Sequence, residues 1–274
     1  MIRAAYVITR RMLTARSGLI DRTMNPYLKH LNKIEFSVSY ACNGRCRHCS
    51  VGAHTSTAEM LDPHLAARAV REIASVYDIK TAMVFGGEPL LFADAVCTIM
   101  RAAAEMEIPR RQVITNGCFS KNADEIRNVA LRLLECGVND LLVSVDAFHQ
   151  ETLPLETVKL FAREAKVLGI PVRLQPAWLV SCEDDNEYNR KTRALLGDFS
   201  DLGILENEGN VVFPEGNALT YLAQYFTGEL PKNPYCEDPF DVRCVSFSPN
   251  GDVLSGNVYR TDVMQILNTY DPCS

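Results

Sequence analysis

The run Ile34-Glu-Phe-Ser-Val-Ser39, followed at once by Cys42-Asn-Gly-Arg-Cys46-Arg-His48-Cys49, decides the architecture of this chain of 274 residues. The first part has strand character, and the second places three cysteines in a loop directly after that strand. From residue 34 onward, β-like and helix-like stretches alternate. This alternation predicts βαβ units, and right-handed crossovers then give a parallel sheet.

The predicted elements begin and end at recognisable signals. Asp62 is a candidate N-cap, Pro63 suits the first turn of a helix, and Gly137 and Gly169 are suited to close two helices. The predicted strands are Ile34–Ser39, Thr81–Phe85, Gln112–Thr115, Leu141–Val145, Pro171–Gln175 and Val211–Phe213. The predicted helices are Pro63–Val76, Ala93–Met106, Asn122–Cys136, Leu155–Leu168 and Asp184–Leu196. About six βα units therefore fit between residues 34 and 225, roughly three quarters of an eight-fold barrel.

The chain changes character near Pro231, where prolines and short β-like pieces replace the alternation. Val245–Ser248 and Asp252–Leu254 are predicted to be joined by the turn Pro249-Asn250-Gly251. We therefore divide the chain into an N-terminal extension (1–33), an α/β barrel domain (34–228) and a small C-terminal β-containing module (229–274).

The composition excludes several classes of protein. With 47% hydrophobic and 23% charged residues the chain is typical of a globular protein, and its net charge of −6 argues against nucleic acid as a partner. No apolar stretch is long enough to predict a membrane span. The acid-poor, arginine-rich segment before residue 34 fits either a transit peptide or a packed helical extension, and the second interpretation is favoured because Pro26 and Leu31 suggest packing.

Ten cysteines without a recognisable signal peptide indicate a reducing compartment, and we expect the cytoplasm. Only Cys42, Cys46 and Cys49 fall close together. Three thiolates would leave one iron of an iron–sulfur cluster open to an outside ligand. The alternatives are a structural zinc site completed by His48 or His54, and a redox dithiol.

The loop pattern C-x3-C-x2-C, with His48 just before the last cysteine, and the downstream run Phe85-Gly86-Gly87-Glu88-Pro89 together resemble the radical SAM family. The resemblance implies a partial (β/α)6, TIM-like barrel. It also implies that Cys42, Cys46 and Cys49 hold a 4Fe-4S cluster whose open iron binds S-adenosylmethionine.

Further cofactor contacts follow from the same resemblance. His48 would lie against the adenine, and Gly86, Gly87 and Glu88 would grip the amino group of S-adenosylmethionine. Other candidates for contacts with the cofactor lie at the ends of the third, fourth and fifth predicted strands. These are Thr115, Asn116, Ser144, Asp146 and Gln175.

Three residues are candidates for later catalytic steps. His149 lies just past a predicted strand end, although a surface histidine is an equal alternative. Cys118 and Cys182 are placed where each could donate a hydrogen atom to a substrate radical, and the alternative is an inert cysteine.

Cys236, Cys244 and the run that begins at Val245 resemble the SPASM and twitch extensions of some family members. Those modules bind auxiliary iron–sulfur clusters and often serve enzymes that modify peptides. Here Ser255-Gly256-Asn257 stand where a cysteine is usual, and only Cys273 follows. We therefore favour a degenerate module without an auxiliary cluster.

The resemblance implies that the chain cleaves S-adenosylmethionine reductively to a 5′-deoxyadenosyl radical, which abstracts hydrogen from a substrate. The electron would come from a reduced flavodoxin or ferredoxin. The leading substrate is a peptide or protein, modified by cross-linking, epimerisation or oxidation. The alternatives are a small molecule of natural-product or cofactor biosynthesis, and a non-enzymatic zinc or iron–sulfur protein.

Overall fold

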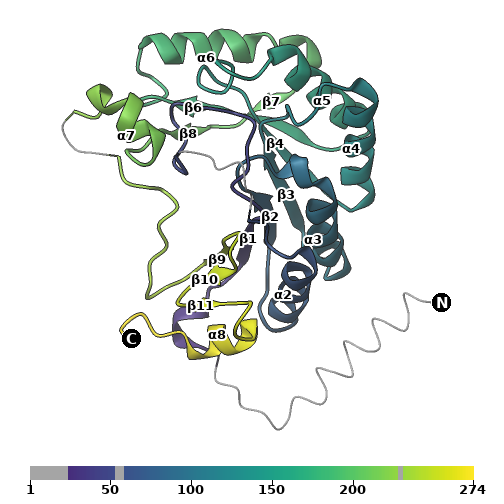
Figure 1. The fold of residues 1–274 in the computed structure, drawn as a ribbon, viewed down its shortest axis with the longest axis vertical. Helices are drawn as coiled ribbons and strands as arrows, with labels where there is room; N and C mark the ends of the chain where they lie inside the picture. Colours follow the sequence, from purple (N-terminus) through teal and green to yellow (C-terminus); the bar gives the residue numbers. More distant parts are fainter. Residues whose placement is uncertain (1–23, 53–58, 228–230) are drawn as a thin grey trace.

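The computed structural model describes residues 24–52, 59–227 and 231–274, so most of the expected N-terminal extension and His54 lie outside the described residues. The fold is built on a seven-stranded sheet in the order β7-β5-β4-β3-β2-β1-β9, in which every neighbouring pair is parallel (Figure 1). The strands are β1 (Lys33–Ser37), β2 (Thr81–Phe85), β3 (Arg110–Thr115), β4 (Asp140–Ser144), β5 (Val172–Gln175), β7 (Leu205–Glu206) and β9 (Cys244–Phe247). The sheet does not close, which confirms the predicted partial barrel.

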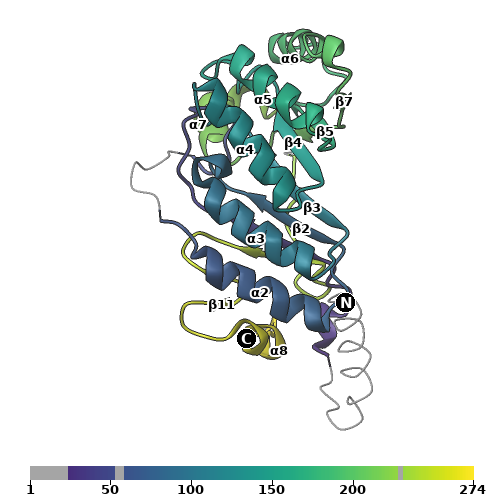
Figure 2. The same cartoon turned by 90° about the vertical axis from the view of Figure 1, so that its right-hand side faces the viewer.

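Helices follow the strands and cover the outer face of the sheet in a row (Figure 2). Asp62 caps the first of them by accepting hydrogen bonds from the backbone N–H groups of His64 and Leu65, as its position predicts. Gly137 and Gly169 each have a φ of +89° just after a helix end, which confirms their role as terminating glycines. The covering helices are α2 (Pro63–Val76), α3 (Ala93–Glu105), α4 (Ala123–Glu135), α5 (Leu155–Val167) and α6 (Glu187–Gly197).

The expected last strand at Val211–Phe213 is not part of the main sheet. Instead, β8 (Asn210–Val211) pairs with β6 (Ala177–Trp178) in a small separate sheet, and β7 occupies the edge beside β5. β7 is two residues long and Leu205 is 72% exposed, so its sequence carries no burial pattern. The other short elements are η1 (Pro26–Leu28), η2 (Pro89–Phe92), η3 (Ser200–Leu202), α7 (Asn217–Tyr221) and η4 (Ala223–Tyr225).

The C-terminal segment adds a strand to the main sheet. β9 runs parallel to β1 in a register that places Phe247 beside Phe36, and the two buried rings stack with centroids 4.8 Å apart. The expected turn at residues 249–251 forms, but β10 (Asp252–Val253) pairs with β11 (Gly256–Asn257) and not with β9. Since β9 and α8 (Val263–Thr269) contribute buried residues to the same hydrophobic core as the barrel, the tail packs as part of it.

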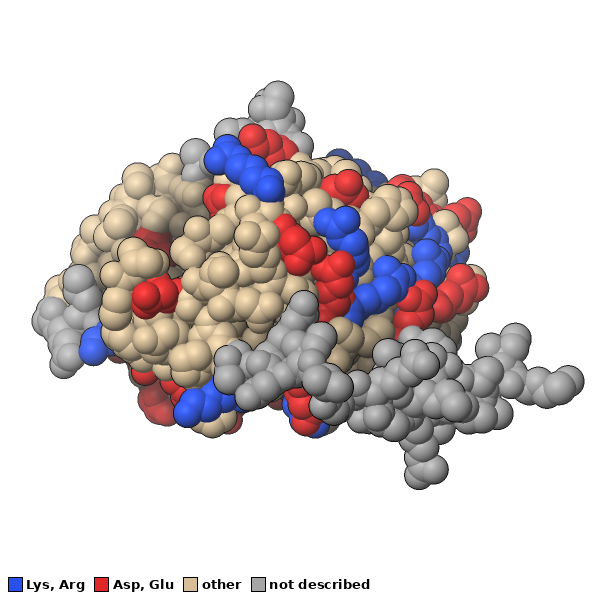
Figure 3. Space-filling view, turned by 90° about the horizontal axis from the view of Figure 1, so that it is seen from below, with Lys and Arg blue, Asp and Glu red and all other residues tan. Residues whose placement is uncertain are grey.

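No helix in the described part of the chain is long and apolar enough to cross a membrane. On the face drawn in Figure 3, basic and acidic side chains of the described residues alternate and form no broad basic area. On that face the described residues therefore form no extended positive surface of the kind that binds a nucleic-acid backbone.

Replacing Phe247 by alanine should lower the free energy of unfolding by about 3–5 kcal/mol, because the change leaves a cavity against Phe36 in the shared core. Phe240→Ala is the matched control: that ring is 57% exposed, and its removal should cost about 1 kcal/mol or less. Chemical denaturation measures both. Equal losses would mean that β9 is not integral to the core.

Candidate active site

A cavity of about 390 Å³ lies at the carboxyl ends of the central strands. It is bordered by the cysteine loop after β1, the glycines after β2 and the polar residues that end β3, β4 and β5. Most of the residues predicted from the sequence line it. These are Cys42, Cys46, His48, Cys49, Gly86, Gly87, Thr115, Asn116, Ser144, Asp146, His149 and Gln175.

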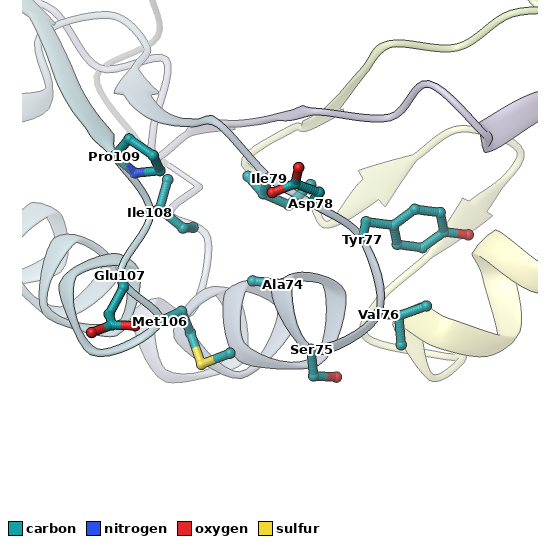
Figure 4. A pocket seen from close by; sticks show the side chains of 10 residues that line it. All are labelled: Ala74, Ser75, Val76, Tyr77, Asp78, Ile79, Met106, Glu107, Ile108 and Pro109. Atoms are coloured by element: carbon teal, nitrogen blue, oxygen red, sulfur yellow. The ribbon is translucent and has the colours of Figure 1, made fainter. Parts of the chain in front are cut away.

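A second hollow of the same volume lies at the opposite end of the sheet, between the ends of α2 and α3. It is lined by residues 74–79 and 106–109, and in Figure 4 the side chains of Tyr77 and Glu107 point away from its centre. No cysteine or histidine is among these described lining residues. Chemistry rather than size therefore identifies the first cavity as the candidate site.

The cysteine loop brings its thiols together by folding tightly around Gly44. The Gly44 N–H lies 3.3 Å from Cys42 Sγ, and a Cβ at this position would meet the Sγ atoms of Cys42 and Cys46 at 3.5 and 3.4 Å. Burial raises the pKa of Cys42 to about 11 and raises that of Cys46 further. A bound metal cation would take the place of these protons and favour the thiolates, so the loop fits a metal or an iron–sulfur cluster.

The two glycines after β2 clamp that loop to the sheet. The Gly87 N–H donates to the Ser39 carbonyl at 2.7 Å, and the Glu88 N–H donates to the Ala41 carbonyl at 2.8 Å. A Cβ on Gly87 would overlap the Ala41 carbonyl, and one on Gly86 would overlap that of Ser39. The glycines are therefore required by the close approach of two backbone segments, in addition to lining the cavity.

Glu88 organises the end of β3 and is not among the residues that line the cavity. Its buried carboxylate accepts hydrogen bonds from Thr115 Oγ1 at 2.6 Å and from the backbone N–H groups of Leu90 and Asn116 at 2.9 and 2.7 Å. Burial raises its pKa to about 7, although these bonds act in the opposite direction. Its predicted contact with the amino group of S-adenosylmethionine stays a prediction.

Asn116 ties the end of β3 to the cysteine loop. Its Nδ2 donates to Asn43 Oδ1 at 3.0 Å and lies 3.8 Å from Cys42 Sγ, within the range of an N–H···S hydrogen bond. Asn116 thereby links the end of β3 to cysteine-loop residues that lie more than sixty positions earlier in the sequence. This arrangement holds the Cys42 thiol in the lining of the cavity.

Buried Asp146 and half-buried His149 form a pair in the lining of the cavity. Asp146 Oδ2 lies 2.7 Å from His149 Nδ1, and the charge of His149 overcomes burial and lowers the pKa of Asp146 to about 2. Burial would lower the pKa of His149, but the charge of Asp146 outweighs it and raises the pKa. His149 therefore lines the cavity with a ring whose orientation is fixed by Asp146, and it is not a surface histidine.

The His48 ring is tilted against Phe148 and meets His149 edge to face, with ring centroids 4.9 and 4.8 Å away. Burial lowers its pKa to about 4, and its buried Nδ1 has no hydrogen-bond partner among the described residues. An orphaned ring nitrogen beside a cavity fits a ligand that supplies a donor or an acceptor there. Ligand atoms of Cys46, His48 and His149 also lie within 4.8 Å of one another, a set that differs from the three-cysteine zinc site considered above.

Gln175 is oriented by a relay of hydrogen bonds that starts at a partly buried ion pair. Arg173 donates hydrogen bonds to both carboxylate oxygens of Asp140, at 2.7 and 2.8 Å. It also donates to Asn207 Oδ1 at 2.9 Å. Because arginine can only donate, Asn207 must present its oxygen to Arg173 and its Nδ2 to Gln175 Oε1, at 2.5 Å. The amide nitrogen of Gln175 is therefore the atom left for the cavity.

Cys118 and Cys182 are not brought to the cavity: Cys118 packs in the hydrophobic core, and Cys182 is exposed. In the tail, Cys236 and Cys273 are exposed and Cys244 lies on β9. Within the described residues these cysteines belong to no group of three ligands able to share an ion. The absence of an auxiliary cluster stays a prediction.

Sequence reasoning missed the far wall of the cavity, formed by Glu35, Phe213, Tyr235 and Ser246. For Glu35 a signal was present, because an acid at an alternate position of the predicted strand Ile34–Ser39 has to face the interior of a barrel. Ser246 was hidden because its strand was not expected to pair with β1.

Replacing Gly87 by alanine should lower the free energy of unfolding by about 1–3 kcal/mol, because the new Cβ forces the Ala41 carbonyl away from the clamp. Gly197→Ala is the control, since a Cβ there meets no atom within 4 Å. It should be neutral or stabilise by up to about 1 kcal/mol, and thermal unfolding compares the two. If both substitutions behave alike, the clamp is not under steric constraint.

Residues 36–169 match the family model described as the radical SAM superfamily. A "Probable GTP 3′,8-cyclase" of Methanocaldococcus jannaschii is 25% identical over 123 residues, which cover 45% of this chain and 39% of that protein. One of the same name from Metallosphaera sedula is 26% identical over 165 residues, covering 57% of this chain and 48% of that protein. The matched stretches thus span less than half the length of these curated relatives.

Among solved structures, the fold is similar to that of SuiB from Streptococcus suis bound to S-adenosylmethionine, with a TM-score of 0.57 and 13% identity over 89% of this chain and 66% of that chain. The SuiB complex with its precursor peptide SuiA gives the same TM-score over 97% of this chain and 70% of the other. At this identity the likeness concerns the fold alone. Residues 36–169 are therefore a radical SAM domain, the domain of a superfamily of enzymes whose cofactors are a 4Fe-4S cluster and S-adenosylmethionine.

Proposed function

We propose that Cys42, Cys46 and Cys49 hold a 4Fe-4S cluster at this cavity and that the chain removes a hydrogen atom from a substrate bound beside it. Together, the cluster and S-adenosylmethionine supply the 5′-deoxyadenosyl radical for this chemistry. The observation that carries the proposal is the convergence of all three thiols on one cavity at the carboxyl ends of the strands. Three protein thiolates leave one iron open for an outside ligand.

The residues around the thiols have distinct tasks in this proposal. Gly86 and Gly87 border the cavity with backbone alone, so a ligand can approach them closely. His48, neutral because its pKa is depressed by burial, offers its unpartnered Nδ1 to the adenine end of S-adenosylmethionine. Thr115, Asn116, Ser144, Asp146 and Gln175 complete the polar lining.

His149 is the best-supported candidate for a catalytic side chain, since it faces the cavity and is oriented by Asp146. A carboxylate that fixes one ring nitrogen leaves the other free to hold or transfer a proton. Cys118 and Cys182 have less support as hydrogen-atom donors, because neither lines the cavity.

A peptide or protein substrate is proposed on the resemblance of Cys236, Cys244 and the run that begins at Val245 to SPASM-type extensions. A small-molecule substrate is the second candidate, and the names of the curated relatives favour it. A reduced flavodoxin or ferredoxin is the proposed electron donor in either case.

Substituting Cys42, Cys46 and Cys49 together by alanine should reduce 5′-deoxyadenosine formation to background, because no open iron can then be held. The assay is anaerobic reconstitution with iron and sulfide, followed by S-adenosylmethionine and dithionite. Cys273→Ala, at an exposed position, is the control and should keep wild-type activity. Wild-type protein that binds one zinc and produces no 5′-deoxyadenosine would instead support the structural zinc site.

Asn207→Asp should weaken binding of S-adenosylmethionine about tenfold, the loss expected for one hydrogen bond to a ligand. The aspartate keeps Arg173 as a partner but can only accept, so Gln175 must turn its nitrogen away from the cavity. Asn128→Asp, on the exposed side of α4, is the matched control. Equilibrium binding to the reconstituted protein measures both, and an unchanged affinity in Asn207→Asp would contradict the relay.

A further inference from the structure

The cavity continues beyond the cysteine loop to the β1–β9 side of the barrel. There it is bordered by Glu35 from β1, Ser246 from β9, and Phe213 and Tyr235 from the segments that lead to β9. Figure 1 shows the chain after α7 running along the open side of the sheet toward β9. These four residues form the far wall of the cavity, and none of them is needed to hold the cluster.

Glu35 is 7% exposed and has acceptor capacity to spare. Its Oε1 pairs with Lys33, which does not line the cavity, and its Oε2 accepts a hydrogen bond from Ser246 Oγ at 2.7 Å. A carboxylate offers about four lone-pair sites, so these two partners leave others open on the cavity side.

Asp146, the other carboxylate in the lining, is already saturated. Its Oδ1 accepts from the backbone N–H groups of Phe148 and His149, both at 2.9 Å. Its Oδ2 faces His149 Nδ1 and accepts from the backbone N–H of Ala177 at 3.2 Å. Glu35 is therefore the acidic group of the lining with capacity for a ligand.

The charge and the aromatic side chains of the cavity lining suit a positively charged ligand. None of the described residues that line the cavity is lysine or arginine, the side chains that bind phosphate groups. Phe213 and Tyr235 meet edge to face with ring centroids 6.1 Å apart, and both rings line the cavity that Glu35 borders. A carboxylate next to aromatic rings is an arrangement that attracts ammonium groups.

We propose that the far wall binds the substrate through an ammonium group, with Glu35 as its counter-ion and Tyr235 and Phe213 as its aromatic flank. This inference rests on the proposed function, because it takes the cavity as the substrate site. It assigns an amine-bearing substrate and argues against a nucleoside triphosphate. The ammonium can belong to a free amine or to a lysine side chain of a peptide.

The test measures binding to the reconstituted protein with S-adenosylmethionine present, by calorimetry under anaerobic conditions. The probes are benzylamine, its neutral counterpart benzyl alcohol, the peptide acetyl-Gly-Lys-Gly amide, and GTP. Wild type should bind benzylamine or the peptide at least tenfold more tightly than benzyl alcohol and GTP. Preference between benzylamine and the peptide identifies the source of the amine.

Glu35→Gln preserves shape but removes the charge, so it should abolish the preference for benzylamine over benzyl alcohol. Glu135→Gln, at an exposed position on α4, is the matched control and should retain it. Tyr235→Leu, which removes a half-exposed ring of the aromatic flank, should weaken amine binding several-fold. Thermal unfolding of each variant confirms that it is folded.

A wild type that binds GTP more tightly than either amine, or that shows no preference for the amines, would overturn the inference. So would an undiminished amine preference in folded Glu35→Gln. Formation of 5′-deoxyadenosine is measured on the same preparations. If it persists while the amine preference fails, only the substrate assignment is wrong; if it is absent, the proposed function itself fails.

Discussion

The pair of hydrogen bonds from Gly87 and Glu88 to the carbonyls of Ser39 and Ala41 is the constraint on which the site depends. It joins the end of β2 to the start of the cysteine loop at a distance that only glycine permits. Without it, three cysteines on a flexible loop would lose conformational entropy each time they closed around a cluster. The parallel pairing of β1 with β2 sets the position of the clamp, so the sheet pre-organises the thiols before any metal binds.

The buried carboxylates of the barrel divide into three kinds according to their partners. Glu88 and Asp146 are satisfied by backbone N–H groups and nearby side chains, and each shapes the end of a strand. Asp140 is satisfied by Arg173 and serves to orient groups further along the relay. Glu35 differs, because its partners are one lysine and one hydroxyl. These leave part of its capacity to accept hydrogen bonds unused. Both of its oxygens have a partner, but a carboxylate has further lone pairs, so a ligand in the cavity can donate to Glu35 without displacing either one.

Local signals made most of this fold predictable. The limits of α2 and β2 agree with those predicted, because a cap, a helix-starting proline and a strand-ending glycine pair all lie in the sequence itself. The motifs at the strand ends likewise placed most of the lining residues. β7 was missed because two exposed residues show no periodicity. The pairing of β9 with β1 was missed because it joins segments about two hundred residues apart, and neither segment carries a local mark of its partner.

That long-range pairing has a consequence for the chemistry of the cavity. In the register of β1 with β9, Glu35 lies beside Ser246, so the hydrogen bond that orients the carboxylate exists only when the tail is part of the sheet. The stacking of Phe36 on Phe247 fixes the same register from the outer face, where apolar burial supplies the free energy. Alternation along the two strands thus directs their apolar residues to the helices and their polar residues to the cavity. The C-terminal segment is therefore both a structural edge of the barrel and one wall of the cavity.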